Sequence, residues 1–274
     1  MRSTAGQNEG KLNRLNRILP EGFLVDAAWL NAQGYSTSLR SQYLAAGWLE
    51  QPTRQVYQRS RTALNWQQVV ISLQTLLECD LAVGGRTALE LKGYGHYLTY
   101  HQTEVHLYGP KRPPTWLNNL PVSAKFVYHN SQRLWDYSVN LGTIATESDS
   151  TPDEAEAHLW GQTGQPLFLS SPERAVLEVL DELPDHESFH QVDQLFEELS
   201  NLSPRRLEEL LLDCHSVKVK RLFFFFADRH RHGWLSRINR AAIDLGKGKR
   251  LLVRGGMLNK PYQITVPGDL DGLR

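Results

Sequence analysis

The first sixty positions alternate apolar and polar residues at the spacing of short helices. Residues 9–19, 25–33 and 36–46 each carry an apolar residue at every third or fourth position, which predicts three helices with one buried side. Ser36 has the side chain that a helix start prefers, because its hydroxyl can accept a hydrogen bond from an otherwise unpaired backbone N–H. We therefore expect the third helix to begin directly after Ser36.

A hairpin is expected after these helices. Residues 48–51 and 55–58 are short runs typical of strands, and they flank a proline-containing turn. The apolar side of the third helix, together with Trp48 and Val56, is interpreted as core. Three helices followed by a hairpin is the order of a winged helix-turn-helix.

The rest of the chain predicts a larger mixed domain. The expected strands are residues 81–83, 104–108, 125–129, 167–169, 250–253 and 262–265. The expected helices are residues 68–78, 86–92, 113–120, 172–182, 188–199, 204–213, 216–230 and 234–244, and residues 146–157 are expected to form a loop. The predicted class is α+β, with a winged helix-turn-helix at 1–62 joined to a mixed α/β domain at 63–274. Within that domain we expect a mixed sheet over 63–170, a helical bundle over 171–248 and closing strands over 249–266.

The net charge of zero conceals a strong segregation of charge. Residues 1–62 carry eight Lys and Arg against four Asp and Glu, and residues 63–214 carry nine against 22. Residues 215–262 carry twelve against two. Basic segments of this kind favour polyanionic partners, although such charges can also pair with one another across a fold.

Cysteine content and hydropathy point to a cytoplasmic location. Only Cys79 and Cys214 are present, too few for a disulfide framework or a zinc motif. The first ten residues lack the apolar stretch of a secretory signal, and the longest apolar run, residues 222–227, is far too short to span a bilayer. We expect no membrane association.

The third helix and the hairpin supply the candidate DNA-binding residues. In a helix-turn-helix the second helix of the motif enters the major groove, where Arg can pair with guanine and Gln with adenine. A hairpin tip usually contacts a phosphate or the minor groove. The candidates are Ser36, Thr37, Ser38, Arg40, Ser41, Gln42, Arg54, Gln55 and Arg59. The alternative is a solvated helix in a protein-interaction module.

The basic C-terminal segment supplies a second candidate surface. We hypothesise that five of its cations lie on one exposed face that acts on a polyanion or an acidic partner: Lys218, Lys220, Arg221, Lys249 and Arg250. The phenylalanines at 223–226 are interpreted as buried core.

No residues form a persuasive catalytic, metal or cofactor site. Gly84 and Gly85 before a helix could hold an anion, but close packing is the commoner reason for such a pair. His96, His101 and His106 are spaced for neither a helix face nor a strand face, so a shared metal is improbable. We expect no enzyme activity, no cofactor and no bound metal.

Several segments in order along the chain resemble the AbiEi antitoxins of bacterial type IV toxin–antitoxin systems. They are residues 46–50 with 56–57, 82–93, 169–175, 216–222 and 260–265. The resemblance implies an N-terminal domain that represses its own operon by binding repeats in promoter DNA. It also implies a C-terminal domain that neutralises a cognate nucleotidyltransferase toxin without a stable complex, as part of phage defence. For the chain itself we expect a monomer or a weak dimer.

Two other functions stay open at this stage. The C-terminal domain could be a nucleic-acid-processing enzyme that the winged helix targets to DNA. The whole chain could instead be a plain transcriptional regulator.

Overall fold

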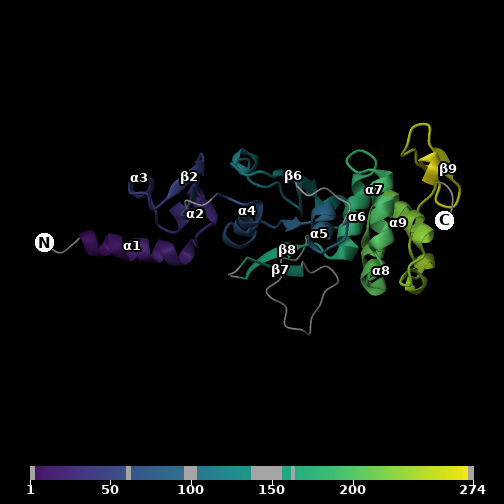
Figure 1. Ribbon diagram of the computed structural model, residues 1–274, viewed down its shortest axis with the longest axis horizontal. Coiled ribbons are helices and arrows are strands. Elements are labelled where there is room, and N and C mark those ends of the chain that lie inside the picture. Colours follow the sequence, from purple (N-terminus) through teal and green to yellow (C-terminus); the bar gives the residue numbers. More distant parts are fainter. Residues whose placement is uncertain (1–3, 60–62, 96–103, 137–155, 162–163, 271–274) are drawn as a thin grey trace. The chain divides into compact units, whose positions relative to one another are not determined.

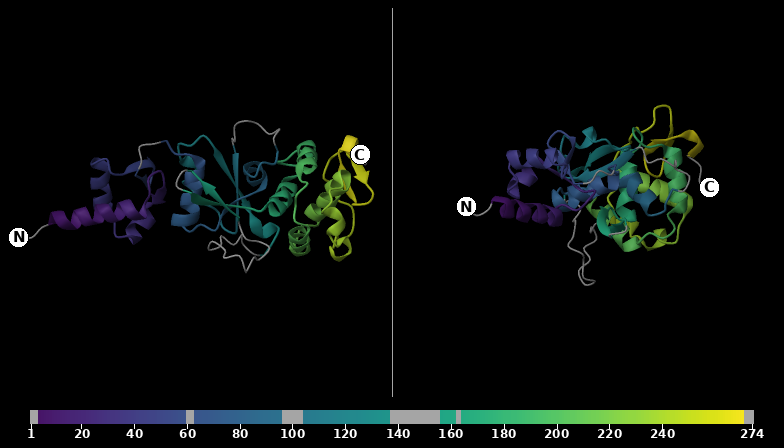
Figure 2. Two further views of the ribbon diagram at one scale, coloured as in Figure 1. Left: turned by 60° about the horizontal axis from the view of Figure 1, so that its bottom comes forward. Right: turned by 60° about the vertical axis from the view of Figure 1, so that its left-hand side comes forward.

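The computed structural model describes residues 4–59, 63–95, 104–136, 156–161 and 164–270. The chain divides into two compact units. Figures 1 and 2 show its helices and strands, coloured along the sequence. Unit 1 comprises residues 1–79, 113–126 and 158–167, and unit 2 comprises residues 80–112, 127–157 and 168–274.

Unit 1 begins with the element order of a winged helix-turn-helix. Its elements are α1 (Thr4–Ile18), β1 (Leu24–Asp26), α2 (Ala27–Ala32), α3 (Thr37–Ala45), β2 (Glu50–Thr53) and β3 (Val56–Gln58). The three strands form one antiparallel sheet in the order β1-β3-β2. The expected helix over 25–33 starts later, because Val25 pairs with Tyr57 in the sheet and Asp26 caps α2 by accepting from Trp29 N at 2.8 Å.

A further helix completes the N-terminal part of unit 1. It is α4 (Trp66–Ile71), which continues into a π-helical turn, Ser72–Leu76. The Ser72 hydroxyl accepts a hydrogen bond from Leu24 N at 3.0 Å and so joins this turn to β1. Trp48 is 46% exposed, so the expectation that it belongs to the core is wrong. Its ring instead meets Tyr43 edge-on at the surface.

A five-stranded sheet has the order β6-β5-β4-β8-β7. Its strands are β4 (Ala82–Val83), β5 (Glu104–Gly109), β6 (Lys125–Asn130), β7 (Glu156–Trp160) and β8 (Gln165–Leu169). Strand β4 pairs antiparallel with β5 and parallel with β8, so the sheet is mixed, as expected. The sequence pattern did not predict β7, which includes the end of the expected loop. Most of that loop, residues 146–155, lies outside the described part of the chain.

Helices make up much of the described part of unit 2. They are α5 (Gly85–Leu91), α6 (Pro172–Glu182), α7 (Phe189–Glu198), α8 (Pro204–Asp213) and α9 (Val217–His230). Helix α6 packs against α5, α8 and α9, and α7 packs against α9, as Figure 1 shows. The four consecutive phenylalanines of α9 are buried, which confirms their expected place in the core.

Three predicted elements are wrong. The expected helix over 113–120 is only a 3-10 turn, Leu117–Asn119, and the expected helix over 234–244 is two such turns, Leu235–Arg237 and Arg240–Ala242. At the start of the second of these segments, the Trp234 indole donates to Leu199 O at 2.7 Å. This tertiary contact outweighs the helix that the apolar spacing over 234–244 predicts. The expected strand over 250–253 makes a single bridge. The closing hairpin is instead β9 (Met257–Asn259) and β10 (Ile264–Val266).

Candidate functional site

Helix α3 presents a polar, uncharged surface to solvent. Ser36 caps the helix by accepting from Leu39 N, and the next turns expose Thr37, Ser38, Ser41 and Gln42. Ser41 also donates to Thr37 O at 3.1 Å. The exposed side of α3 has hydroxyls and an amide but no carboxylate, so nothing on it repels a phosphate backbone.

Arg40 does not lie on this exposed surface, contrary to the sequence expectation. Its side chain is only 5% exposed. One guanidinium nitrogen donates to Tyr35 O at 2.7 Å and to Asn31 Oδ1 at 2.5 Å, and the other donates to Thr37 Oγ1 at 3.0 Å. The reason is helical geometry, because Arg40 is three residues before the buried Tyr43 and shares its side of the helix. Arg40 therefore fixes the turn between α2 and α3 instead of reaching a base.

The hairpin keeps two of its three predicted contact residues free. Arg54 and Gln55 are exposed at the tip between β2 and β3, where Gln55 has a left-handed φ of 64°. Arg59 is engaged within unit 1: it donates to Asn16 O at 2.9 Å and Leu19 O at 2.8 Å. These carbonyls lie at the C-terminal end of α1, so Arg59 caps that helix and its expected role in DNA contact is not supported by its position.

The five C-terminal cations do not share one exposed face, so that expectation is wrong. Lys220 and Arg221 are buried. Arg221 donates to Leu245 O and Gly248 O, both at 2.7 Å, and Lys218 donates to Asp181 O at 2.5 Å and Leu183 O at 2.9 Å. The Arg221 and Lys218 side chains therefore hold the fold together by donating to backbone carbonyls. Lys249 and Arg250 are exposed, as expected.

The glycine pair before α5 serves packing. Glu178, fully buried on α6, accepts from Gly85 N at 2.8 Å and from Arg174 Nε at 2.9 Å. The Arg174 guanidinium lies over the Trp135 ring, 4.3 Å from its centroid. A side-chain carboxylate thus occupies the helix start where an anion was considered, and a Cβ at Gly84 would collide with it.

A second buried cluster joins two strands to α6. His129 bridges Glu182 and His106, with ring nitrogens 2.9 Å from the Glu182 carboxylate and 2.9 Å from His106 Nδ1. Burial, followed by the neighbouring His129, lowers the pKa of His106 to about 4. Across the described residues, no group of three or more His, Cys, Asp or Glu is placed to hold a metal ion. His96 and His101 lie outside the described residues.

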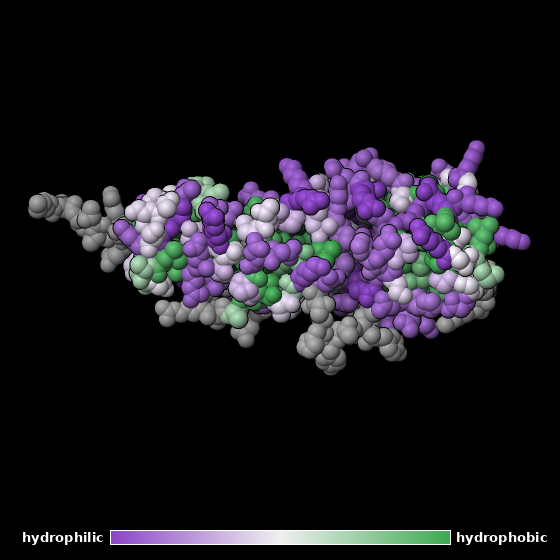
Figure 3. Space-filling model, turned by 90° about the horizontal axis from the view of Figure 1, so that it is seen from above, coloured by the Kyte–Doolittle hydropathy of each residue, from purple (hydrophilic) through white to green (hydrophobic). Residues whose placement is uncertain are grey.

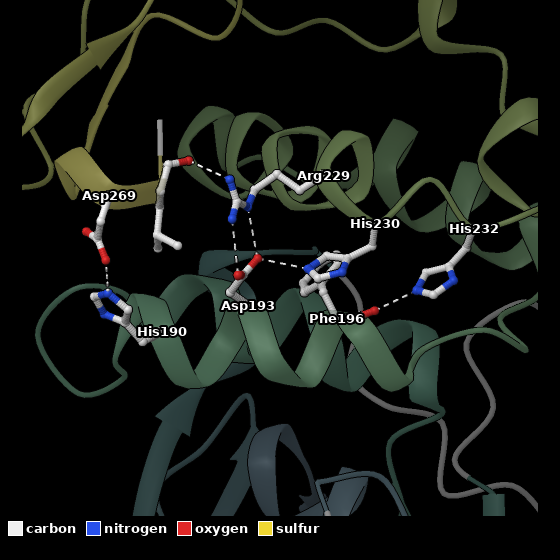
Figure 4. A network of polar contacts seen from close by, with 8 residues as sticks. His190, Asp193, Phe196, Arg229, His230, His232 and Asp269 are labelled. Carbon is white, nitrogen blue, oxygen red and sulfur yellow. Dashed lines mark hydrogen bonds and ion pairs between the residues drawn. The ribbon is translucent and has the colours of Figure 1, made fainter. Parts of the chain in front are cut away.

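A third cluster fastens α7 to α9, and sequence patterns did not single it out (Figure 4). Buried Asp193 accepts from Arg229 Nε at 3.0 Å and lies 2.8 Å from His230 Nε2, while Arg229 also donates to Leu270 O at 2.7 Å. Burial alone would raise the pKa of Asp193, but hydrogen bonds from His230 and Arg229 hold it well below its usual range. No spacing signal could have revealed it, because the partners are 36 or more residues apart.

The described helices do not include one with the length and apolar character that a bilayer crossing requires.

Two family descriptions match the sequence. Residues 8–100 match the N-terminal domain of AbiEi antitoxin transcriptional regulators, and residues 102–267 match the AbiEi antitoxin transcriptional regulator of type IV TA systems. No curated protein matches the sequence. The crystal structure of the RV2827C protein from Mycobacterium tuberculosis is similar in fold, with a TM-score of 0.54 and 13% identity over 96% of this chain and 92% of that chain. Since the second description alone covers more than half of the sequence, the chain belongs to the AbiEi family of antitoxin transcriptional regulators of type IV toxin–antitoxin systems.

Proposed function

We propose that this protein represses its own operon by binding repeats in the promoter and neutralises a cognate nucleotidyltransferase toxin in the cytoplasm. Residues 1–62 would carry DNA recognition, and residues 63–274 would carry antitoxin activity. The observation that supports the first activity is the exposed side of α3, which is polar and free of carboxylates.

DNA recognition would depend on neutral side chains, since Arg40 is occupied within the fold. Gln42 has the amide that pairs with adenine in the major groove, and the hydroxyls of Ser38 and Ser41 suit either a base edge or a phosphate. Arg54 at the hairpin tip would contact a phosphate or the minor groove and add affinity more than specificity.

The test is a reporter driven by the protein's own promoter, combined with growth rescue during expression of the nucleotidyltransferase encoded beside it. Gln42→Ala should relieve repression, because loss of a base contact costs about 1–3 kcal/mol of specific binding. The same variant should still rescue growth, since its substitution lies outside residues 63–274. Gln194→Ala, an exposed glutamine on α7, is the matched control and should repress normally.

Two results would contradict the proposal. If the variant that carries both Gln42→Ala and Ser38→Ala still represses fully, α3 is not the helix that contacts the bases of the promoter. Failure of the wild-type protein to rescue growth would remove the assignment of a nucleotidyltransferase as its target.

A further inference from the structure

The first residue of α3 has a hydroxyl whose hydrogen-bonding role is set by its neighbour. Thr37 is exposed, and its Oγ1 accepts from a guanidinium nitrogen of Arg40 at 3.0 Å. A guanidinium has donors and no acceptor, so Thr37 Oγ1 is the acceptor in this contact. The hydroxyl hydrogen takes no part in it and is left for a partner outside the protein.

The guanidinium that contacts Thr37 is held in place from several sides. Arg40 is buried, and its other terminal nitrogen donates to Tyr35 O at 2.7 Å and to Asn31 Oδ1 at 2.5 Å. The guanidinium also lies 5.6 Å from the centroid of the Tyr57 ring on β3. A charged donor polarises the hydroxyl that it contacts. The Thr37 hydroxyl is therefore a strengthened donor and a weakened acceptor.

One turn later, the hydroxyl of Ser41 has the opposite role. Ser41 Oγ donates to Thr37 O at 3.1 Å, so its hydrogen is used inside the helix. The lone pairs of Oγ stay available, and Ser41 is exposed. Residues four positions apart lie on the same side of a helix. Helix α3 thus presents a donor at Thr37 and an acceptor at Ser41, about 5 Å apart along its axis.

The rest of the exposed surface of α3 has no charge that could outweigh these two hydroxyls. In Figure 3 pale surface, the colour of weakly polar residues, is visible at the left, where Figure 1 places α3. The exposed residues of the helix are Thr37, Ser38, Ser41, Gln42 and Ala45. Since none of them is charged, the direction of each hydrogen bond decides which DNA group it fits.

DNA offers acceptors and donors at different places. The acceptors in the major groove are O6 and N7 of guanine, N7 of adenine and O4 of thymine, and the phosphate oxygens also accept. The only donors in the major groove are the amino groups of adenine and cytosine. A hydroxyl that donates fits the first set, and a hydroxyl that accepts fits the second set and no phosphate.

We propose that α3 distinguishes DNA groups by the direction of these two hydrogen bonds. Thr37 donates to an acceptor of the DNA, either a base edge or a phosphate oxygen, and Ser41 accepts from the amino group of an adenine or a cytosine. Arg40 is a positioning residue, because it sets the direction of the Thr37 hydroxyl from inside the fold. The proposal rests on the promoter binding proposed above and names the DNA groups that α3 recognises.

The test measures binding of the full-length protein to its promoter fragment by fluorescence anisotropy, with one DNA group changed at a time. The first series of fragments has deaza- or thio-substituted bases, which remove or weaken one groove acceptor each. The second series has a methylphosphonate at one position, which removes the charged oxygen of one phosphate. The third series has base analogues that lack the amino group of adenine or cytosine.

Three protein variants are compared with wild type. Thr37→Val and Ser41→Ala each remove one hydroxyl with little change in shape. Thr75→Val is the matched control, because Thr75 is exposed in the π-helical turn of unit 1 and its hydroxyl donates to Ile71 O, as that of Ser41 does to Thr37 O. Thermal melting verifies that all three are folded.

Thr37→Val and Ser41→Ala should each weaken promoter binding about threefold to tenfold, the effect of one hydrogen bond. The loss in Thr37→Val should be non-additive with one change in the first or the second series, which assigns its partner to a base or to a phosphate. The loss in Ser41→Ala should be non-additive with one change in the third series. Thr37→Ser should bind almost as wild type does, and Thr75→Val should bind as wild type does.

Arg40→Lys tests the positioning role. The lysine keeps the positive charge but lacks the planar group that reaches Tyr35 O and Thr37 Oγ1 together. In this background the coupling between Thr37 and its DNA acceptor should fall, whereas the coupling of Ser41 should stay. Unchanged coupling of Thr37 would remove Arg40 from the proposal.

Several outcomes would overturn the inference while wild type still prefers its promoter to shuffled DNA, which leaves the proposed function intact. These are coupling of Thr37→Val to a lost amino group, coupling of Ser41→Ala to a lost acceptor, coupling of either variant to no DNA group, and unchanged promoter affinity in either. If wild type binds promoter and shuffled DNA equally, the proposed DNA recognition fails, and this inference fails with it.

Discussion

Removal of the Asp193 carboxylate is expected to destabilise unit 2 severely. The group is buried between α7 and α9 and receives hydrogen bonds from Arg229 and His230. Asp193→Ala would take from the buried Arg229 guanidinium the carboxylate that it now contacts through two of its nitrogens. An uncompensated buried charge is the reason that breaking such a pair is more costly than losing a surface ion pair.

The expected loss is about 3–5 kcal/mol for Asp193→Ala, the range for one partner of a buried pair. Asp193→Asn keeps the shape and one good acceptor, so we expect about 2 kcal/mol. In a domain of this size the alanine variant should lower the melting temperature by about 10 °C. Both losses of unfolding free energy should become smaller below about pH 4. The pKa of Asp193 is lower in the folded state than in the unfolded state, so the stability that its carboxylate contributes is complete above the unfolded-state pKa and is lost as the pH falls.

The assay is urea unfolding followed by circular dichroism at pH 7 and at pH 3.5. Gln194→Ala, exposed on the same helix, is the control and should change stability by less than about 0.5 kcal/mol. A loss below about 1 kcal/mol for Asp193→Ala would refute the reasoning, since it would mean that Arg229 finds other partners easily.

Other variants test the remaining contacts. Arg40→Ala should destabilise unit 1 by about 2–4 kcal/mol through lost charged hydrogen bonds, measured by thermal melting, while Ser41→Ala should leave the melting temperature unchanged. Burial lowers the pKa of His106 to about 4, so between pH 7 and pH 5 only the unfolded chain gains that proton, and His106 should contribute a loss of about 2 kcal/mol in unfolding free energy. His106→Asn should make the fall in stability over this pH range smaller by about that amount, measured by urea unfolding. Gly84→Ala should cost about 2 kcal/mol or more in urea unfolding, because its Cβ would collide with Glu178.

Local patterns predicted much of the fold because their physical causes are local. The cap at Ser36 and the apolar spacing of α6 to α9 are set by residues within a few positions of one another, and these elements were expected nearly as they occur. The expected helix over 234–244 failed because Trp234 is held by a carbonyl 35 residues away.

Side-chain exposure was predicted less successfully, because it depends on contacts between residues that are far apart in the sequence. Arg40, Arg59 and Arg221 are charged, so composition favours their exposure. Each is instead bound to carbonyls brought close by tertiary folding. Long cationic side chains can donate hydrogen bonds to buried carbonyls that lack other donors, and a sequence does not reveal where those carbonyls lie. The other exposed residues of α3 were placed correctly, because helical periodicity decides their side, and the same periodicity puts Arg40 on the side of the buried Tyr43.

The most direct test of the account is fluorescence anisotropy of the full-length protein with its own promoter fragment and with a shuffled fragment, both at about 150 mM salt. The account predicts that the promoter binds roughly a thousandfold more tightly than the shuffled fragment. Gln42→Ala should reduce promoter affinity about tenfold or more and leave affinity for the shuffled fragment unchanged. Equal affinity for the two fragments, or a Gln42→Ala variant that binds the promoter as wild type does, would contradict the claim that α3 reads promoter DNA.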